Sequence, residues 1–135
     1  MREPPGADII LLNHEKKVLL VLRDDKPSIP CPNTWALLGG YVEENELPAE
    51  AIRRELQEEI DLDLENIQFF KEYSWEQCDE YIFWHQIDLD LTKIHLKEGQ
   101  KLAYFSHIEL QDLDFASHYG EILTEFFTYL ENSSS

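Results

Sequence analysis

The sequence predicts an α/β fold in which a mixed β-sheet lies between helices. Apolar runs of strand length occur before and after a central amphipathic segment, and a second amphipathic segment closes the chain. Strands, a helix, further strands and a last helix in that order are typical of a sheet packed between helices. With 135 residues, 43% of them hydrophobic, the chain suits one domain. We expect this domain to span residues 1–131, with a disordered tail at 132–135.

The expected strands follow from short apolar runs bounded by turn residues. The first two runs, at residues 7–13 and 17–23, are joined by a short polar turn and predict a hairpin. A loop with three prolines follows, and a short apolar element then leads into a pair of glycines, Gly39 and Gly40. Further strands are expected at residues 67–74, 81–89 and 101–106, with a turn at 77–80, and a last helix at 115–130.

The central helix is expected to begin at Pro48, because proline suits the first helical turn. Ile52, Leu56 and Ile60 recur at a spacing of four residues, which predicts one apolar stripe that packs on the core. Asp61 follows at a position that favours the left-handed backbone conformation. Aspartate tolerates that conformation better than most residues other than glycine.

Three glutamates lie close together beside the apolar stripe of this helix. At 100° per residue, Glu55, Glu58 and Glu59 share an arc of about 100° on one helix face. Like charges so close together destabilise a helix unless a cation lies between them. Arg54 lies outside this arc, so we do not expect it to neutralise three glutamates. Carboxylate oxygens suit a hard divalent cation, which indicates Mg²⁺ or Mn²⁺.

The segment from the glycine pair to the end of this helix resembles the Nudix box, whose pattern is Gly-x5-Glu-x7-Arg-Glu-U-x-Glu-Glu-x-Gly-U with U aliphatic. The chain matches eight of the nine specified positions: Gly40, Glu46, Arg54, Glu55, Leu56, Glu58, Glu59 and Leu62. The departure is Asp61, where the family has glycine. The resemblance implies a Nudix-type α/β/α sandwich over essentially the whole chain.

The resemblance also implies where divalent metal and substrate bind. By position in the box, Glu58 and Glu59 correspond to metal ligands, and Glu55 to a ligand or to the base that deprotonates water. The carbonyl of Gly40 corresponds to an additional ligand. Gly39 and Gly40 are expected to let the backbone approach the substrate closely.

Further roles follow from the same resemblance. Arg54 and Glu46 correspond to a structural pair that orients the loop against the helix. Glu98, in a Glu-Gly-Gln run, corresponds to a fourth acidic ligand or an alternative base, and the other interpretation is a solvated glutamate in a polar turn. Arg23, at the end of the second expected strand, corresponds to an arginine that reaches the nucleotide, where its fork could bond two phosphate oxygens. The other interpretation is an exposed arginine at a strand end.

Composition limits the class of partner. The formal charge is 11 − 28 = −17, which disfavours binding to nucleic acid or to anionic membrane surfaces. Two cysteines form neither a disulfide framework nor a metal cluster, and no signal segment or long apolar run is visible. We therefore expect a cytoplasmic protein that is a monomer or a homodimer and binds a small nucleotide.

Taken together, the sequence predicts a Mg²⁺-dependent pyrophosphohydrolase that cleaves a nucleoside diphosphate linked to another group. The favoured substrate is a nucleoside triphosphate, canonical or oxidised, which would give a nucleoside monophosphate and pyrophosphate. One alternative is hydrolysis of ADP-ribose or a nucleotide sugar by the same fold. Another alternative is a non-catalytic Nudix-fold module that binds a nucleotide.

Overall fold

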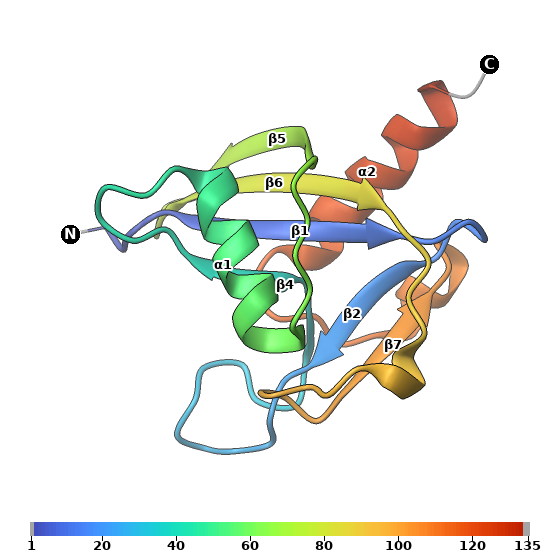
Figure 1. Cartoon of the computed structure of the whole chain (residues 1–135), viewed down its shortest axis with the longest axis horizontal. Helices are drawn as coiled ribbons and strands as arrows, with labels where there is room; N and C mark the ends of the chain where they lie inside the picture. Colours follow the sequence, from blue (N-terminus) through green and yellow to red (C-terminus); the bar gives the residue numbers. More distant parts are fainter. Residues whose placement is uncertain (1, 134–135) are drawn as a thin grey trace.

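The computed structural model describes residues 2–133 and confirms the predicted α/β sandwich. A seven-stranded sheet has α1 on one face and α2 on the other (Figure 1). The strands are β1 (Gly6–Leu12), β2 (Val18–Leu22), β3 (Trp35–Ala36), β4 (Leu38–Tyr41), β5 (Gln68–Ser74), β6 (Asp79–Gln86) and β7 (Lys101–Phe105). The helices are α1 (Pro48–Ile60) and α2 (Tyr119–Ser133), with short 3-10 turns at Leu91–Lys93 and Ile108–Asp112.

The sheet is mixed, as predicted. Its main order is β3-β2-β1-β6-β5, with β4 paired to β1 and β7 paired to β2. The pairing of β1 with β6 is parallel, and the other named strand pairs are antiparallel. Strands β4 and β2 pair with the same edge of β1. β4 pairs with the first half of β1, and β2 pairs with it at the far end, so the sheet divides along this edge.

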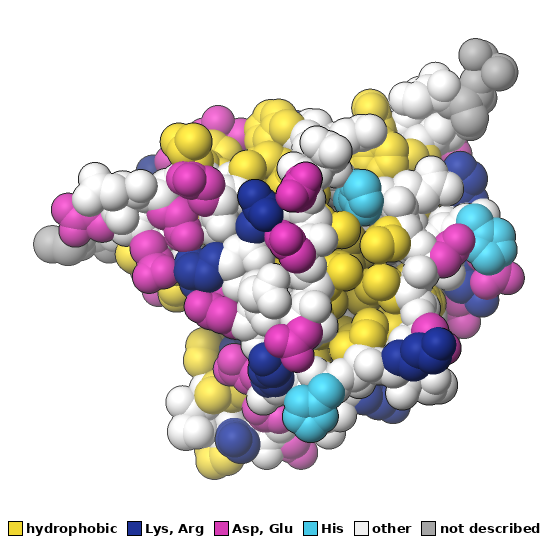
Figure 2. Space-filling view, viewed as in Figure 1, with side chains coloured by type: hydrophobic (Ala, Val, Ile, Leu, Met, Phe, Trp, Pro, Cys, Tyr) yellow, Lys and Arg dark blue, Asp and Glu magenta, His cyan; other side chains and the backbone are white. Residues whose placement is uncertain are grey.

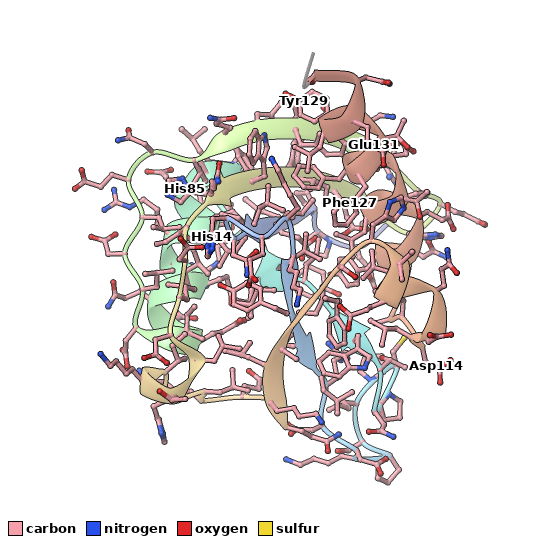
Figure 3. The ribbon with its side chains drawn as sticks, turned by 90° about the vertical axis from the view of Figure 1, so that its right-hand side faces the viewer. His14, His85, Asp114, Phe127, Tyr129 and Glu131 are labelled. Atoms are coloured by element: carbon pink, nitrogen blue, oxygen red, sulfur yellow. The ribbon has the colours of Figure 1, made fainter. Side chains whose placement is uncertain are left out.

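Strand β1 is buried on both faces and carries both halves of the core. Ala7, Ile9 and Leu11 belong to the cluster that includes the apolar stripe of α1. Ile10 and Leu12 belong to the cluster on the α2 side. A view turned by 90° shows α2, with Phe127 and Tyr129 on it, along the opposite side of the sheet from α1 (Figure 3). The near-continuous apolar run of this strand is what a sheet covered on both faces requires.

Helix α1 has the bounds that the sequence predicts. It starts at Pro48, and the carboxylate of Glu50 accepts a hydrogen bond of 2.8 Å from the backbone N–H of Leu47. This bond satisfies one of the N–H groups that a helix start leaves unpaired. The helix ends where Asp61 adopts the left-handed conformation, with φ 54° and ψ 35°. The expectation for this departure from the family pattern is confirmed.

Strand β6 differs from the predicted strand at 81–89. It begins at Asp79 and ends at Gln86, so two of the residues expected in a turn are strand residues. The reason is the parallel pairing with β1, which starts with Gly6 opposite Glu80 and ends with Leu12 opposite Gln86. The partner strand sets both ends, and the local sequence does not show it.

The last helix begins later and ends later than predicted. Phe115 forms a parallel bridge with Trp35, and this pairing keeps the chain out of a helix until Tyr119. The helix then continues to Ser133, so Asn132 and Ser133 do not belong to a disordered tail. The rest of the expected tail, 134–135, lies outside the described residues. Within residues 2–133, no helix is long and apolar enough to cross a bilayer.

The contribution of the α1 stripe can be measured at Ile52, which is fully buried. Replacing it by alanine should lower the free energy of unfolding by about 2–5 kcal/mol, because it removes buried methyl groups and leaves a cavity. Gln57→Ala, on the exposed side of the same helix, should change it by less than about 0.5 kcal/mol. Urea unfolding of the two variants tests this, and equal effects would contradict the assigned face.

Candidate functional site

A cleft of about 490 Å³ lies where the sheet divides, between α1, β4 and the start of α2. It gathers six residues that the sequence predicts for the site: Arg23, Gly39, Gly40, Glu55, Glu59 and Glu98. Asp and Glu side chains are scattered over the face that carries α1, with Lys and Arg side chains among them (Figure 2). Segments far apart in the chain therefore meet in a strongly acidic cleft.

Two glycines allow β4 to pass close to its neighbours. A Cβ atom at Gly40 would collide with the Glu55 carboxylate, which would have to move. Gly39 has φ +150°, and a Cβ atom there would lie 2.2 Å from the carbonyl oxygen of Ala7 and 2.7 Å from the Cα atom of Asp8. The close approach of two backbones therefore requires glycine at position 39. The Gly40 backbone lies directly beside the carboxylates of α1.

Glu59 shows how unfavourable the accumulated charge is. Burial, together with a hydrogen bond and charge repulsion from Glu55, raises the pKa of Glu59 to about 8. The charges of Glu98 and Glu58 raise this pKa further. Like-charged carboxyl groups in a half-buried site resist ionisation unless a cation offsets their charge. The electrostatics of the site therefore favour a bound cation.

Arg54 links the helix to the loop that follows β4. Its guanidinium donates hydrogen bonds of 2.8 and 3.0 Å to the Glu46 carboxylate and one of 3.0 Å to the carbonyl of Tyr41. The predicted structural pair is confirmed. The guanidinium also lies 2.9 Å from Glu55 and 3.5 Å from Glu58. Its long side chain reaches beyond the angular position of its Cα atom and so offsets part of the charge of Glu55 and Glu58. As expected, this one guanidinium does not neutralise three glutamates, since like charges still raise the pKa of Glu59.

Glu58 is the predicted ligand that the structure does not place in the cleft. Its side chain is 58% exposed, and its one ion pair among residues 2–133 is the 3.5 Å contact with Arg54. Among residues 2–133, no three His, Cys, Asp or Glu side chains already converge on one point in the way that would hold a metal ion. The candidate metal-ligand atoms beside α1 are nevertheless all oxygens, and they carry excess negative charge. In its chemistry, the donor set fits a hard divalent cation.

Glu98 is brought to the cleft by a turn that is attached to the end of α1. The backbone N–H of Lys97 donates to the carbonyl of Glu59 at 3.1 Å. The Lys97 ammonium lies 2.8 Å from the carboxylate of Asp61. The aspartate that departs from the family pattern therefore holds the turn that carries Glu98. Glu98 lines the same cleft as Glu55, and its role as a ligand or base stays a prediction.

Arg23 borders the cleft and also holds the proline-rich loop. Its guanidinium donates to the carbonyl of Pro30 at 2.8 Å and to that of Cys31 at 3.3 Å. Gln100 donates to the Arg23 carbonyl and to Asn33, so the loop is fastened from both sides. This loop contact was not predicted. It excludes a merely solvated strand end, and phosphate binding by Arg23 stays a prediction.

Sequence reasoning missed two acidic residues in the cleft, Asp8 and Glu80, which are only 4% and 6% exposed. Tyr119 donates a hydrogen bond of 2.9 Å to Oδ1 of Asp8. Burial and the neighbouring Glu80 carboxyl raise the pKa of Asp8 well above its usual range. A signal was available for Asp8, because it is a charged residue inside an apolar strand. No comparable signal marks Glu80, which was expected in a turn.

Comparison with known families agrees with this geometry. The family model for the NUDIX domain matches residues 2–126. The chain belongs to the Nudix family. A search of curated protein sequences finds no match.

Solved structures of the same fold include proteins from several bacteria. This Nudix domain is 21% identical to a MutT protein from a study of Aliivibrio salmonicida and Vibrio cholerae, with a TM-score of 0.73 and coverage of 89% and 93% of the two chains. It is 20% identical to a MutT/Nudix family protein from Listeria innocua, with a TM-score of 0.78 and coverage of 98% and 96%. The NUDIX domain of Shewanella oneidensis NrtR, cocrystallised with ADP ribose, is 15% identical, with a TM-score of 0.77 and coverage of 96% and 90%.

Replacing Asp61 separates its backbone role from its side-chain role. Asp61→Gly relieves the positive φ but removes the exposed ion pair with Lys97, and the two effects offset each other to within about 1 kcal/mol. Asp61→Ala loses the ion pair without relieving the backbone, so it should be about 1 kcal/mol less stable than Asp61→Gly. Urea unfolding checks this order. A glycine variant less stable than the alanine variant would show that the carboxylate matters more than the backbone.

The pKa of Glu59 predicts how stability depends on pH in protein freed of metal by chelator. The folded state holds a proton up to about pH 8, whereas an unfolded glutamate releases it near its usual pKa of 4.5. The folded state binds more protons between these values, so stability should fall as the pH rises through this window. Melting temperatures measured across it test the sign. Glu59→Gln should flatten the slope, while Glu44→Gln, at an exposed site, should not; an unchanged slope in Glu59→Gln would assign the effect elsewhere.

Proposed function

We propose that this Nudix protein is a Mg²⁺-dependent pyrophosphohydrolase, with Mn²⁺ as a substitute, that cleaves a nucleoside diphosphate linked to another group. The proposed substrate is a nucleoside triphosphate, canonical or oxidised, and the products are a nucleoside monophosphate and pyrophosphate. The observation that carries the proposal is the meeting of Glu55, Glu59 and Glu98 with the Gly40 backbone in one cleft. A divalent cation would offset their repulsion and also neutralise an anionic substrate.

In this proposal the carboxylates of α1 and of the turn that carries Glu98 have two roles, metal binding and general-base catalysis. Glu58, Glu59 and Glu98, with the Gly40 carbonyl, would hold the metal, which polarises phosphate oxygens when bound. Glu55 is a further ligand or the base. As the base, its carboxylate accepts a proton from the water whose oxygen attacks phosphorus, and the phosphoanhydride bond breaks with pyrophosphate as the leaving group. Glu58 would have to turn from Arg54 toward the cleft.

The substrate end of the proposal rests on the cleft itself. Gly39 and Gly40 expose backbone on its wall, and Arg23 lies on its border. We assign Arg23 to a phosphate group, in addition to the loop carbonyls that it holds. The cleft volume of about 490 Å³ lies within the range of small-ligand sites.

ADP-ribose is the second candidate substrate, and the NrtR domain cocrystallised with ADP ribose supports it. A nucleotide sugar belongs to the same class. A non-catalytic nucleotide-binding module is a different class, and the three repelling carboxylates of α1 argue against it, because a binder does not need them. We also propose a cytoplasmic monomer or homodimer; Cys31 and Cys78 are both free thiols, which suits a reducing compartment.

The test is release of phosphate or pyrophosphate from a nucleotide panel with Mg²⁺ and with chelator. The panel spans canonical and oxidised triphosphates, ADP-ribose, nucleotide sugars and dinucleoside polyphosphates. Metal-dependent cleavage of triphosphates supports the proposal, and cleavage of ADP-ribose alone selects the second candidate. Silence across the panel, with no effect of Mg²⁺ on the melting temperature, would overturn the proposed site.

Variants of the helix carboxylates test the assignment of the metal end. Glu58→Gln and Glu59→Gln should each lower turnover by at least about 100-fold, because each removes a charged oxygen while the fold is kept. Glu44→Gln, on the exposed loop before the helix, should retain turnover. The readout is the initial rate at saturating substrate, with circular dichroism as the control for folding. Full activity in Glu58→Gln would leave this residue exposed and outside the metal site.

A further inference from the structure

The cleft contains a second acidic group apart from the carboxylates of α1. Asp8 lies on β1 and Glu80 on β6, and the parallel pairing of these strands sets Gly6 opposite Glu80. By strand alternation, both acidic side chains lie on the α2 side of the sheet, the side where Ile10 and Ile82 are buried. The α1 carboxylates lie on the other side, so the cleft has two acidic ends.

This second pair is buried without a cationic partner. Asp8 is 4% exposed and Glu80 is 6% exposed, and none of the ion pairs among residues 2–133 includes either of them. Tyr119 satisfies only Oδ1 of Asp8, and Oδ2 has no donor in the described residues. Burying a carboxyl group without its hydrogen bonds is costly. An unsatisfied acceptor in a ligand-sized cleft therefore indicates a donor that arrives with the ligand.

The cleft extends to the pair. Gly6 also lines it, and a Cβ atom placed on Gly6 would make ordinary van der Waals contacts, at 3.7 Å with Glu80 and at 3.9 Å with the Gly40 carbonyl. Gly39 pairs with Asp8 across the two strands, and a Cβ atom on it would lie 2.7 Å from Oδ1 of Asp8. Both acidic residues line the same cleft as Glu55 and Glu59. A ligand can therefore reach the pair from the cleft that holds the metal end.

We propose that Asp8 and Glu80 form a specificity-determining subsite for a heterocycle that presents an amino group next to a ring N–H. This inference rests on the proposed function, which supplies a nucleotide whose phosphates lie at the α1 end. The heterocycle is the donor-bearing part of such a ligand, and two acidic acceptors match two adjacent donors. A ring with carbonyl oxygens at that edge would face carboxylate oxygens and leave them unpaired.

Guanine has this edge, and hypoxanthine lacks only the amino group. A site built to hydrogen-bond a substrate group rejects an analogue without it much more strongly than an apolar pocket rejects a missing methylene. The opposing interpretation is that the two carboxyl groups share one proton and bind nothing. In that case the amino group of the ligand has no effect on affinity.

The experiment is calorimetric titration of the whole chain with GMP and with IMP in the presence of Mg²⁺. Monophosphates are products in the proposed reaction, so binding is measured without turnover. We expect GMP to bind at least about tenfold more tightly than IMP. Equal affinities, or no binding of GMP, would overturn the inference.

Variants locate the preference. In Asp8→Asn and in Glu80→Gln the ratio of the two affinities should fall to nearly one, because an amide N–H replaces an acceptor oxygen. Asp24→Asn removes the same charge elsewhere on the cleft and should keep the ratio. Two variants are used because one could fail to fold, which circular dichroism and melting would show. A ratio that persists in a folded variant of either residue would overturn the inference.

The outcomes separate this inference from the proposed function. Selective binding of GMP, lost in the variants, supports the subsite even when no nucleotide is hydrolysed, and the chain would then be a nucleotide-binding module. Metal-dependent hydrolysis of triphosphates with equal binding of GMP and IMP supports the enzyme and overturns the subsite.

Discussion

The contacts of Arg54 are the interaction on which the site depends. One guanidinium bonds to Glu46 and to the Tyr41 carbonyl, which fixes the loop after β4 against α1. The same group lies against Glu55, inside a cluster of like charges. Without it, the Glu55 carboxylate beside Gly40 would lack this cationic partner. Arginine suits this task because its planar fork offers several donors at fixed angles.

The cleft contains two groups of acidic side chains whose charged forms are unfavourable, and the two groups differ in their surroundings. At the α1 end, several carboxylates repel one another across an open, half-buried site, which is the environment that a hard cation stabilises. At the other end, Asp8 and Glu80 are almost fully buried and form no ion pair within residues 2–133, and a neutral donor suits them better. Phosphate and heterocycle are the two chemically different parts of a nucleotide. The two ends of the cleft differ in a corresponding way.

The apolar core of the fold offsets the free-energy cost of burying and crowding these carboxyl groups. Strand β1 is buried on both faces, and its apolar side chains join the α1 and α2 halves of the core. Asp8 is the exception within this strand, since it places a carboxyl group where an apolar side chain would be more stable. Glu98 also reaches the cleft at a cost in stability. The turn that carries it is held by Asp61, which adopts the unfavourable left-handed conformation. Residues that are less stable than the alternatives at their positions therefore concentrate around the cleft.

The sequence alone determined the helix that carries the site. Period-four apolar residues, Pro48 and Asp61 fixed α1 to its observed ends, and helical geometry placed Glu55 and Glu59 on the cleft side. These features are local, so the order of residues is enough to predict them. Arg54 showed the limit of this reasoning, because a long side chain can reach groups that its helical angle excludes.

Only the tertiary structure decided which distant segments meet. The parallel register of β1 and β6 brings Asp8 and Glu80 together, and it also sets both ends of β6. The bridge from Trp35 to Phe115 delays the start of α2 and so places Tyr119 beside Asp8. Strand pairing depends on contacts between residues far apart in the chain, and no local pattern records which partner or register is chosen.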